Sequence, residues 1–263
     1  MSEDEDPLGA LVARSVGGDV QDVRAEALAG EDGLERKRLR FTRDGRMTSA
    51  LFERSPRGIV MEAQVLPFLA RKTPHVPRVH SRGIPPPHAS LGPWLLLEDL
   101  SDAASACDGE AMDIIRAKIA VERAVAADGP ALRALGVPVR TPLDVVREER
   151  GDATAEEAAL ELGAWPVALV HGDLICERAR RTERGVVLVR WSAAHLGCGL
   201  LDAVRLAADL RERGRTRDAD VVVETYVAES GGPTDDALVR AAKRMDALLR
   251  DAGRRSRATP PLE

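Results

Sequence analysis

The chain has 263 residues, with 38 basic and 43 acidic side chains and a formal net charge of −5. Hydrophobic residues make up 44 % of it and aromatic residues only 3 %, a composition typical of a globular protein with a substantial core. No apolar run is long enough for a membrane span, and an acidic, aromatic-poor chain is a poor nucleic-acid binder. Because the first residues are acidic, we expect no signal or transit peptide and a cytoplasmic location.

Cysteine and lysine are both rare. The cysteines are Cys107, Cys176 and Cys198, and they lack the short spacings of a zinc site or a disulfide framework. We therefore expect neither a disulfide nor a bound metal. Lysine occurs only at Lys37, Lys72, Lys118 and Lys243, which matters where a kinase would need one.

The N-terminal hundred residues predict a small, mostly antiparallel sheet with one helix. After an acidic tail at 1–7, period-two patterns and turn residues predict strands over 23–29, 37–42, 47–54, 76–80 and 94–97. Helical spacing predicts one helix over 59–70, although Pro67 would kink it or end it early.

The second part of the chain predicts a mainly helical domain. Helical patterns cover 110–127, 155–163, 200–210, 219–229 and 235–252. Thr154 and Glu157 have the spacing of a capping box. Short apolar runs at 167–170 and 186–189 predict two buried strands that pair with each other. We expect an N-terminal lobe over 8–100, a C-terminal lobe over 101–253 and a flexible tail over 254–263.

One segment carries most of the functional information. A buried strand leads into His171-Gly172-Asp173, a second apolar strand ends near Arg190-Trp191, and Asp202 follows where the next helix opens. This order resembles the aminoglycoside phosphotransferase and choline kinase family, which has a two-lobed, protein-kinase-like α+β fold. The resemblance implies that Asp173 accepts or orients the proton of a substrate hydroxyl.

Other residues acquire roles from the same resemblance. His171 is expected to anchor the loop rather than transfer protons, and Asp202 to cap its helix and brace the loop. Gly30 and Gly33 resemble the hairpin that covers the phosphates of ATP, and Glu62 resembles the helix glutamate that pairs with a strand lysine. The family holds adenine through a segment that corresponds here to Leu97, Glu98 and Leu100.

Three positions depart from the family pattern. Arg178 stands where the family has an asparagine, and Arg190 where it has a metal-binding aspartate. Glu53 stands where the family has the strand lysine; a shift of one residue would place Phe52 or Arg54 there instead, and this strand contains no lysine. Magnesium requires oxygen ligands, and an arginine remains protonated in proteins. Metal-assisted phosphoryl transfer should therefore fall by many decades. We expect no cofactor, with ATP and magnesium bound only if the enzyme is nevertheless active.

These departures suggest a hypothesis about the site. Arg178 and Arg190 could neutralise Glu53, Glu62 and Asp173 in an internal ion-pair network. Alternatively, the two arginines could bind an anionic ligand directly. Cys176 lacks a base other than His171 and is not expected to be a nucleophile. His195 is expected in a surface or loop position.

The sequence therefore favours a catalytically degenerate phosphotransferase that acts by binding or regulation. Its partner would be a small-molecule or anionic ligand in the interlobe cleft, or another protein. The alternative is an active ATP-dependent phosphotransferase that modifies a hydroxyl of a small polar molecule. A third possibility is nucleotidyl transfer with the nucleotide inverted.

Overall fold

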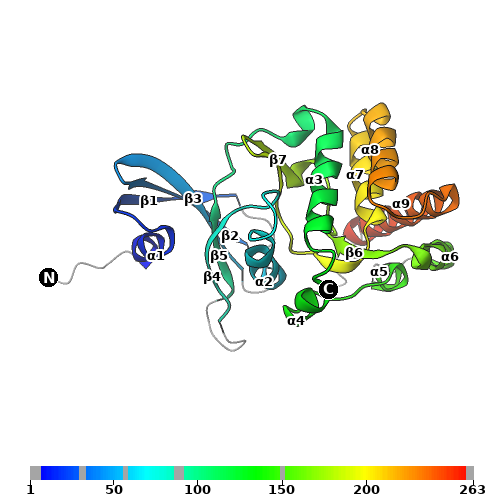
Figure 1. The fold of residues 1–263 in the computed structure, drawn as a ribbon, viewed down its shortest axis with the longest axis horizontal. Helices are drawn as coiled ribbons and strands as arrows, with labels where there is room; N and C mark the ends of the chain where they lie inside the picture. Colours follow the sequence, from blue (N-terminus) through cyan, green and yellow to red (C-terminus); the bar gives the residue numbers. More distant parts are fainter. Residues whose placement is uncertain (1–6, 30–33, 56–58, 86–91, 149–151, 259–263) are drawn as a thin grey trace. The chain divides into compact units, whose positions relative to one another are not determined.

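The computed structural model describes residues 7–29, 34–55, 59–85, 92–148 and 152–258. The predicted phosphate-covering residues Gly30 and Gly33 lie outside these ranges. The chain divides into two compact units, residues 1–103 and 104–263, whose elements are labelled in Figure 1. No helix in the described ranges is long and apolar enough to cross a membrane.

Unit 1 is built on a five-stranded antiparallel sheet. Its order is β1-β2-β3-β5-β4, with the ladder of β2 and β3 turning at Asp44 and Gly45. The strands are β1 (Val20–Leu28), β2 (Glu35–Arg43), β3 (Arg46–Arg54), β4 (Val79–Gly83) and β5 (Trp94–Glu98). The strand predicted at 76–80 lies at 79–83 instead, because residues 76–78 belong to no strand and Pro77 has no N–H for a ladder.

Two helices accompany this sheet. The helix α2 (Val60–Leu69) was expected and tolerates Pro67 near its end, whereas α1 (Pro7–Val16) was not. Val12 of α1 packs with Leu39, Phe41 and Phe52, which are buried on the same side of their strands. Residue 7, assigned to the acidic tail, instead begins this helix.

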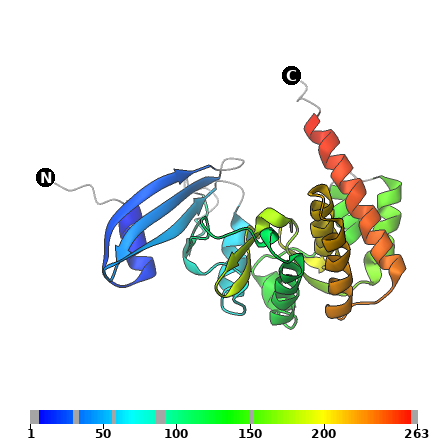
Figure 2. The same cartoon turned by 90° about the horizontal axis from the view of Figure 1, so that it is seen from above.

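Unit 2 is mainly helical. Its helices are α3 (Ala111–Ala124), α4 (Gly129–Ala134), α5 (Pro142–Glu148), α6 (Ala153–Glu161), α7 (Leu200–Glu212), α8 (Thr216–Glu229) and α9 (Asp236–Ala258). Figure 2 shows α9 as the long orange-to-red helix, and it extends into the segment expected to be a flexible tail. The cap of α6 is Asp152, which accepts a hydrogen bond from the Ala155 N–H, rather than Thr154.

The strands of unit 2 pair differently from the expectation. The strand β6 (Val167–Val170) pairs with β9 (His195–Cys198), and β8 (Gly185–Leu188) pairs with β7 (Ala179–Thr182). The expected pairing of β6 with β8 is wrong because a tight turn before Gly185 folds β8 back on β7. His195 is consequently buried in a strand rather than placed at the surface.

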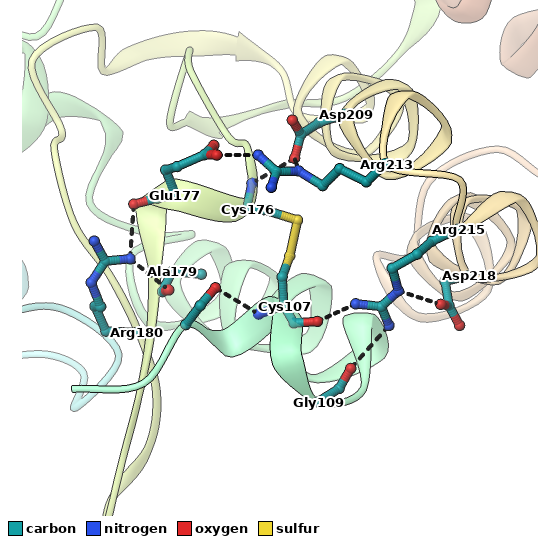
Figure 3. The surroundings of a disulfide bond; sticks show 11 residues. Cys107, Gly109, Cys176, Glu177, Ala179, Arg180, Asp209, Arg213, Arg215 and Asp218 are labelled. Atoms are coloured by element: carbon teal, nitrogen blue, oxygen red, sulfur yellow. Dashed lines mark hydrogen bonds and ion pairs between the residues drawn. A yellow bond between two sulfur atoms is a disulfide. The ribbon is translucent and has the colours of Figure 1, made fainter.

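Unit 2 also contains a disulfide that the cysteine spacing did not predict. Cys107 and Cys176 are bonded, with their Cα atoms 5.5 Å apart, as Figure 3 shows. Their separation of 69 residues leaves no local pattern in the sequence. The remaining cysteine, Cys198, is free and buried, and burial raises the pKa of its thiol to about 12.

Candidate functional site

The loop of residues 171–178, called here the HGD loop, is held by hydrogen bonds from its backbone to the carboxylate of Asp202. This carboxylate accepts hydrogen bonds from the His171 N–H at 2.6 Å and the Gly172 N–H at 3.0 Å. It also lies 3.2 Å from the Lys118 ammonium. Asp202 belongs to the first turn of α7, so this helix fixes the backbone of the loop. The expectation that Asp202 caps the helix is wrong, because Gly199 is the N-cap and the Asp202 carboxylate is used by the loop instead.

Lys118 is the buried counter-charge of this arrangement. Its ammonium donates to the Leu169 carbonyl at 2.8 Å and to the Glu122 carboxylate, and the side chain is fully buried. Burial alone would lower the pKa of Lys118, but the negative charges of Glu122 and Asp202 outweigh it and raise the pKa. Burial opposes ionisation of Asp202 as well, and Lys118 nevertheless keeps its pKa below the usual value.

His171 uses both ring nitrogens to hold the backbone. Its Nε2 donates to the Val189 carbonyl at 3.0 Å, and its Nδ1 accepts from the Asp173 N–H at 3.3 Å. Because burial lowers the pKa of His171, the ring is neutral near pH 7. Its centroid lies 4.7 Å from that of the Trp191 ring. This geometry is that of a structural histidine, since no ring nitrogen remains to contact a substrate.

Asp173 is directed to a different partner. Its carboxylate accepts a hydrogen bond from Arg178 Nε at 3.0 Å, and 38 % of its side chain is exposed. The residue that the family resemblance gives as a base is thus paired with the arginine that stands where the family has an asparagine.

Two backbone conformations shape the loop segments. Gly172 has φ 85°, and a Cβ there would lie 2.4 Å from the Ala193 carbonyl oxygen, so only glycine fits. Arg190 has φ 70°, which is unusual for a residue with a side chain. Such a conformation costs on the order of 1 kcal/mol or more, and it persists here at the position where a metal-binding aspartate was expected.

The described site residues predicted in unit 1 lie on β3, α2 and β5, apart from Leu100, which follows β5. Glu53 is buried and pairs with Arg36 Nε at 2.8 Å, a partner the sequence did not suggest. Glu62 is buried in α2. In the segment expected to hold adenine, Leu97 is buried.

Two backbone groups of that segment already have partners within unit 1. The Glu98 N–H donates to the Arg78 carbonyl at 2.9 Å, and the Leu100 carbonyl accepts from the Ala103 N–H at 3.1 Å. These two groups are therefore less available to a purine ring.

One link of the hypothesised ion-pair network is present within unit 2, namely Arg178 with Asp173. Within unit 1, Glu53 instead pairs with Arg36. The links from Glu53 or Glu62 to Arg178 or Arg190 would join the two units and remain a hypothesis.

The residues around Asp173 do not fit a magnesium ion. The ion requires several oxygen ligands, whereas the carboxylate of Asp173 is paired with the guanidinium of Arg178, which repels a cation. In the described part of the chain, no group of three or more histidine, cysteine, aspartate or glutamate side chains is arranged to hold a metal.

The far end of the HGD loop is anchored by contacts that sequence reasoning missed. The Cys176 N–H donates to Asp209 Oδ2 at 2.9 Å, and Arg213 Nε reaches the same carboxylate at 3.0 Å. Arg213 also pairs with Glu177. Figure 3 shows these contacts beside the disulfide. The loop is thus fastened at its start by Asp202 and at its end by Asp209, both from α7.

Comparison with solved structures shows which known proteins have the same fold. No protein-family model and no curated protein sequence matches the chain. The solved structure of the amicoumacin kinase hAmiN is similar with a TM-score of 0.63, 12 % identity, and coverage of 99 % of this chain and 89 % of that one. Spectinomycin phosphotransferase APH(9)-Ia gives a TM-score of 0.64 at 8 % identity, with coverage of 96 % and 88 %.

A choline kinase shows the same likeness. LicA from Streptococcus pneumoniae matches with a TM-score of 0.60 and 11 % identity, over 97 % of this chain and 92 % of that chain. At these identities the similarity concerns the fold. The α+β fold expected from the sequence is confirmed: the chain has the fold of aminoglycoside phosphotransferases and choline kinases.

Proposed function

We propose that this protein is a catalytically degenerate relative of the small-molecule phosphotransferases and that it acts by binding a ligand. The observation that carries the proposal is the 3.0 Å ion pair between Arg178 and Asp173. An arginine cannot deprotonate to release this carboxylate. The side chain that would receive a substrate proton is therefore held by a cation.

The electrostatics of the flanking positions support the same conclusion. Arg190 adds a second guanidinium where an oxygen ligand would be needed, and β3 carries the buried Glu53 instead of a lysine. In phosphoryl transfer the metal and the lysine neutralise charge that develops on the phosphates. Each loss of about 1.4 kcal/mol in transition-state stabilisation slows the reaction about tenfold, so three replacements together should abolish measurable transfer.

A second candidate function is retained because 38 % of the Asp173 side chain is exposed. A substrate hydroxyl could reach this carboxylate if Arg178 rotated away. The protein would then be an ATP-dependent phosphotransferase acting on a small polar molecule. The fold neighbours, which include phosphotransferases, are compatible with either function.

The test measures the thermal stability of the protein with ATP, with and without magnesium, together with phosphate release. We expect no magnesium-dependent stabilisation and no turnover for the wild type. Restoring the family pattern with Arg178→Asn and Arg190→Asp should increase the response to magnesium. Arg147→Asn, which changes an exposed arginine on α5, is the matched control. Magnesium-dependent stabilisation of the wild type with phosphoryl transfer would favour the second function.

A further inference from the structure

Unit 2 contains a cavity of about 100 Å³ beside the start of the HGD loop. Gly172 forms part of its wall, Val170 and Leu201 supply apolar surface, and Arg140 and His195 supply polar groups. A cavity of this size holds several water molecules. It therefore has room for a small organic ligand.

His195 lines this cavity and has an unused hydrogen-bond acceptor. Its side chain is only 3 % exposed, and its Nδ1 lies 3.0 Å from the Ala193 carbonyl. A carbonyl can only accept, so Nδ1 carries the proton and Nε2 has a free lone pair. This Nε2 is buried and has no hydrogen-bond partner among the described residues. Buried acceptors are normally satisfied, so a donor from a ligand or a water molecule belongs here.

Arg140 lines the same cavity and has an unused donor. Its Nε is buried without a hydrogen-bond partner in the described part of the chain, while its Nη2 pairs with Glu148. The Glu148 side chain is 57 % exposed, and exposed ion pairs contribute little to stability. Arg140 can therefore exchange this partner for a ligand carboxylate, which matches the planar fork of a guanidinium.

The backbone brings these two groups together. The Arg140 N–H donates to the Leu196 carbonyl at 2.9 Å, next to an isolated bridge between Val139 and Leu196. A Cβ on Gly197 would lie 2.6 Å from the Arg140 carbonyl oxygen and 3.3 Å from His195 Nε2. The glycine thus allows the close approach of the segment that carries Arg140 to the strand that carries His195.

The other charged groups of the cavity already have partners. Arg205 Nε donates to Asp246 at 2.7 Å, and Asp202 pairs with Lys118. Burial would lower the pKa of Arg205, but the charge of Asp246, with smaller contributions from Asp173 and Asp202, raises it. Arg205 therefore stays protonated and adds a fixed positive charge within electrostatic reach of Asp173.

We propose that this cavity binds a small hydroxycarboxylic acid, whose carboxylate accepts from Arg140 and whose hydroxyl donates to His195 Nε2. The inference rests on the proposed function, because it names the class of ligand that the protein binds. The site lies entirely within unit 2 and requires neither nucleotide nor metal. This separates the proposal from the question of phosphoryl transfer.

The test compares three probes of nearly equal size by calorimetry or ligand-observed NMR, without ATP or magnesium. Lactate carries both recognition groups, propionate lacks the hydroxyl, and propane-1,2-diol lacks the charge. We expect lactate to bind about 3- to 10-fold more tightly than propionate and the diol not to bind. Equal binding of all three probes overturns the proposal. So does the absence of saturable binding of lactate, which would mean that the cavity holds only water.

Variants then assign the contacts. Arg140→Gln should weaken lactate binding by about tenfold or more, whereas the matched Arg147→Gln should not change it. Glu148→Gln should tighten binding, because it removes the carboxylate that competes for Arg140. His195→Asn keeps a donor near the Ala193 carbonyl and should remove the preference for lactate over propionate. Equal effects of Arg140→Gln and Arg147→Gln overturn the proposal even if His195→Asn fails to fold.

The results also separate this proposal from the proposed function. If lactate binds and is phosphorylated with magnesium and ATP, the proposed function fails and the cavity assignment stands. If lactate does not bind and no phosphoryl transfer occurs, only the cavity assignment fails.

Discussion

The ammonium of Lys118 lies 3.2 Å from the carboxylate of Asp202, and both side chains are buried. Asp202 in turn accepts two backbone hydrogen bonds from the HGD loop. The position of the loop therefore depends on Asp202, whose buried charge is compensated by Lys118 on α3. Removing either charge would leave the other buried without compensation, which is strongly destabilising.

Replacement of this lysine should have a large effect on stability. We expect Lys118→Met to lower the free energy of unfolding by about 3–5 kcal/mol, because Asp202 and Glu122 lose their buried cation. Urea denaturation measures this change. Lys243→Met alters an exposed lysine on α9 and should change stability by less than about 0.5 kcal/mol. Similar losses for both variants would show that the buried pair does not stabilise unit 2.

The glycine of the HGD loop can be tested against a matched glycine. Gly172 and Gly214 have φ 85° and 77°, so alanine at either position pays on the order of 1–2 kcal/mol for the left-handed backbone. At Gly172 the new Cβ would also meet the Ala193 carbonyl oxygen at 2.4 Å, whereas nothing lies within 4 Å at Gly214. We expect Gly172→Ala to destabilise clearly more than Gly214→Ala in chemical denaturation. Equal losses would mean that the loop can move away from Ala193.

The disulfide should make stability dependent on reductant. A disulfide that closes a loop with a sequence separation of 69 residues reduces the conformational entropy of the unfolded chain. It is expected to stabilise the folded state by about 4 kcal/mol in this way. Thermal denaturation with and without dithiothreitol should show this difference. Cys107→Ser should be less stable and insensitive to reductant. Cys198→Ala is the control and should remain sensitive, since Cys198 is not bonded.

We expect the protein to lose stability at mildly acidic pH, because three of its histidines have lowered pKa values in the folded state. Burial lowers the pKa of His80, His171 and His195 below the usual 6.5. The unfolded chain therefore binds more protons than the folded one as the pH falls below about 6.5. Stability is fully present above this value and decreases as the pH falls toward the folded-state pKa values.

Denaturation at a series of pH values between about 7.5 and 5 measures this effect. The lowered pKa of Asp202 makes a separate contribution to stability. Because the usual pKa of this group is 3.8, that contribution is lost only in stronger acid. His195→Asn should make the decrease in stability around pH 6 less steep, because one of the three histidines is removed. An unchanged profile in this variant would contradict the contribution of His195.

Much of the fold could be predicted because it follows from local patterns. Alternating residues such as Leu39 and Phe41 face the core of unit 1, and β6 agrees with its expected residues, 167–170. The short helix α1 and the strand β9 were missed. The latter contains His195 and Gly197, which have no strong strand preference and are fixed by pairing with β6.

The candidate site was only partly predictable. The bracing role of Asp202 followed from its place in the order of elements. Lys118 was not singled out, although it falls on the buried side of α3 with Ile114, Ile115 and Val121, where a lysine signals a buried partner. The disulfide and the contact of Arg36 with Glu53 depend on distant segments, and no local spacing in the sequence indicates them.

The bond between Cys107 and Cys176 also closes a ring in the main chain of unit 2 that contains some of its helices and not others. Every helix from α3 to α6, together with β6, belongs to a closed ring of the main chain, whereas α7, α8 and α9 follow outside it. The HGD loop up to Cys176 is part of this ring, whereas hydrogen bonds to Asp202 and Asp209 hold it to α7, which follows outside the ring. In an oxidised molecule, displacement of α7 would release the loop from these two carboxylates, while Cys176 would stay bonded to Cys107 in the turn that precedes α3.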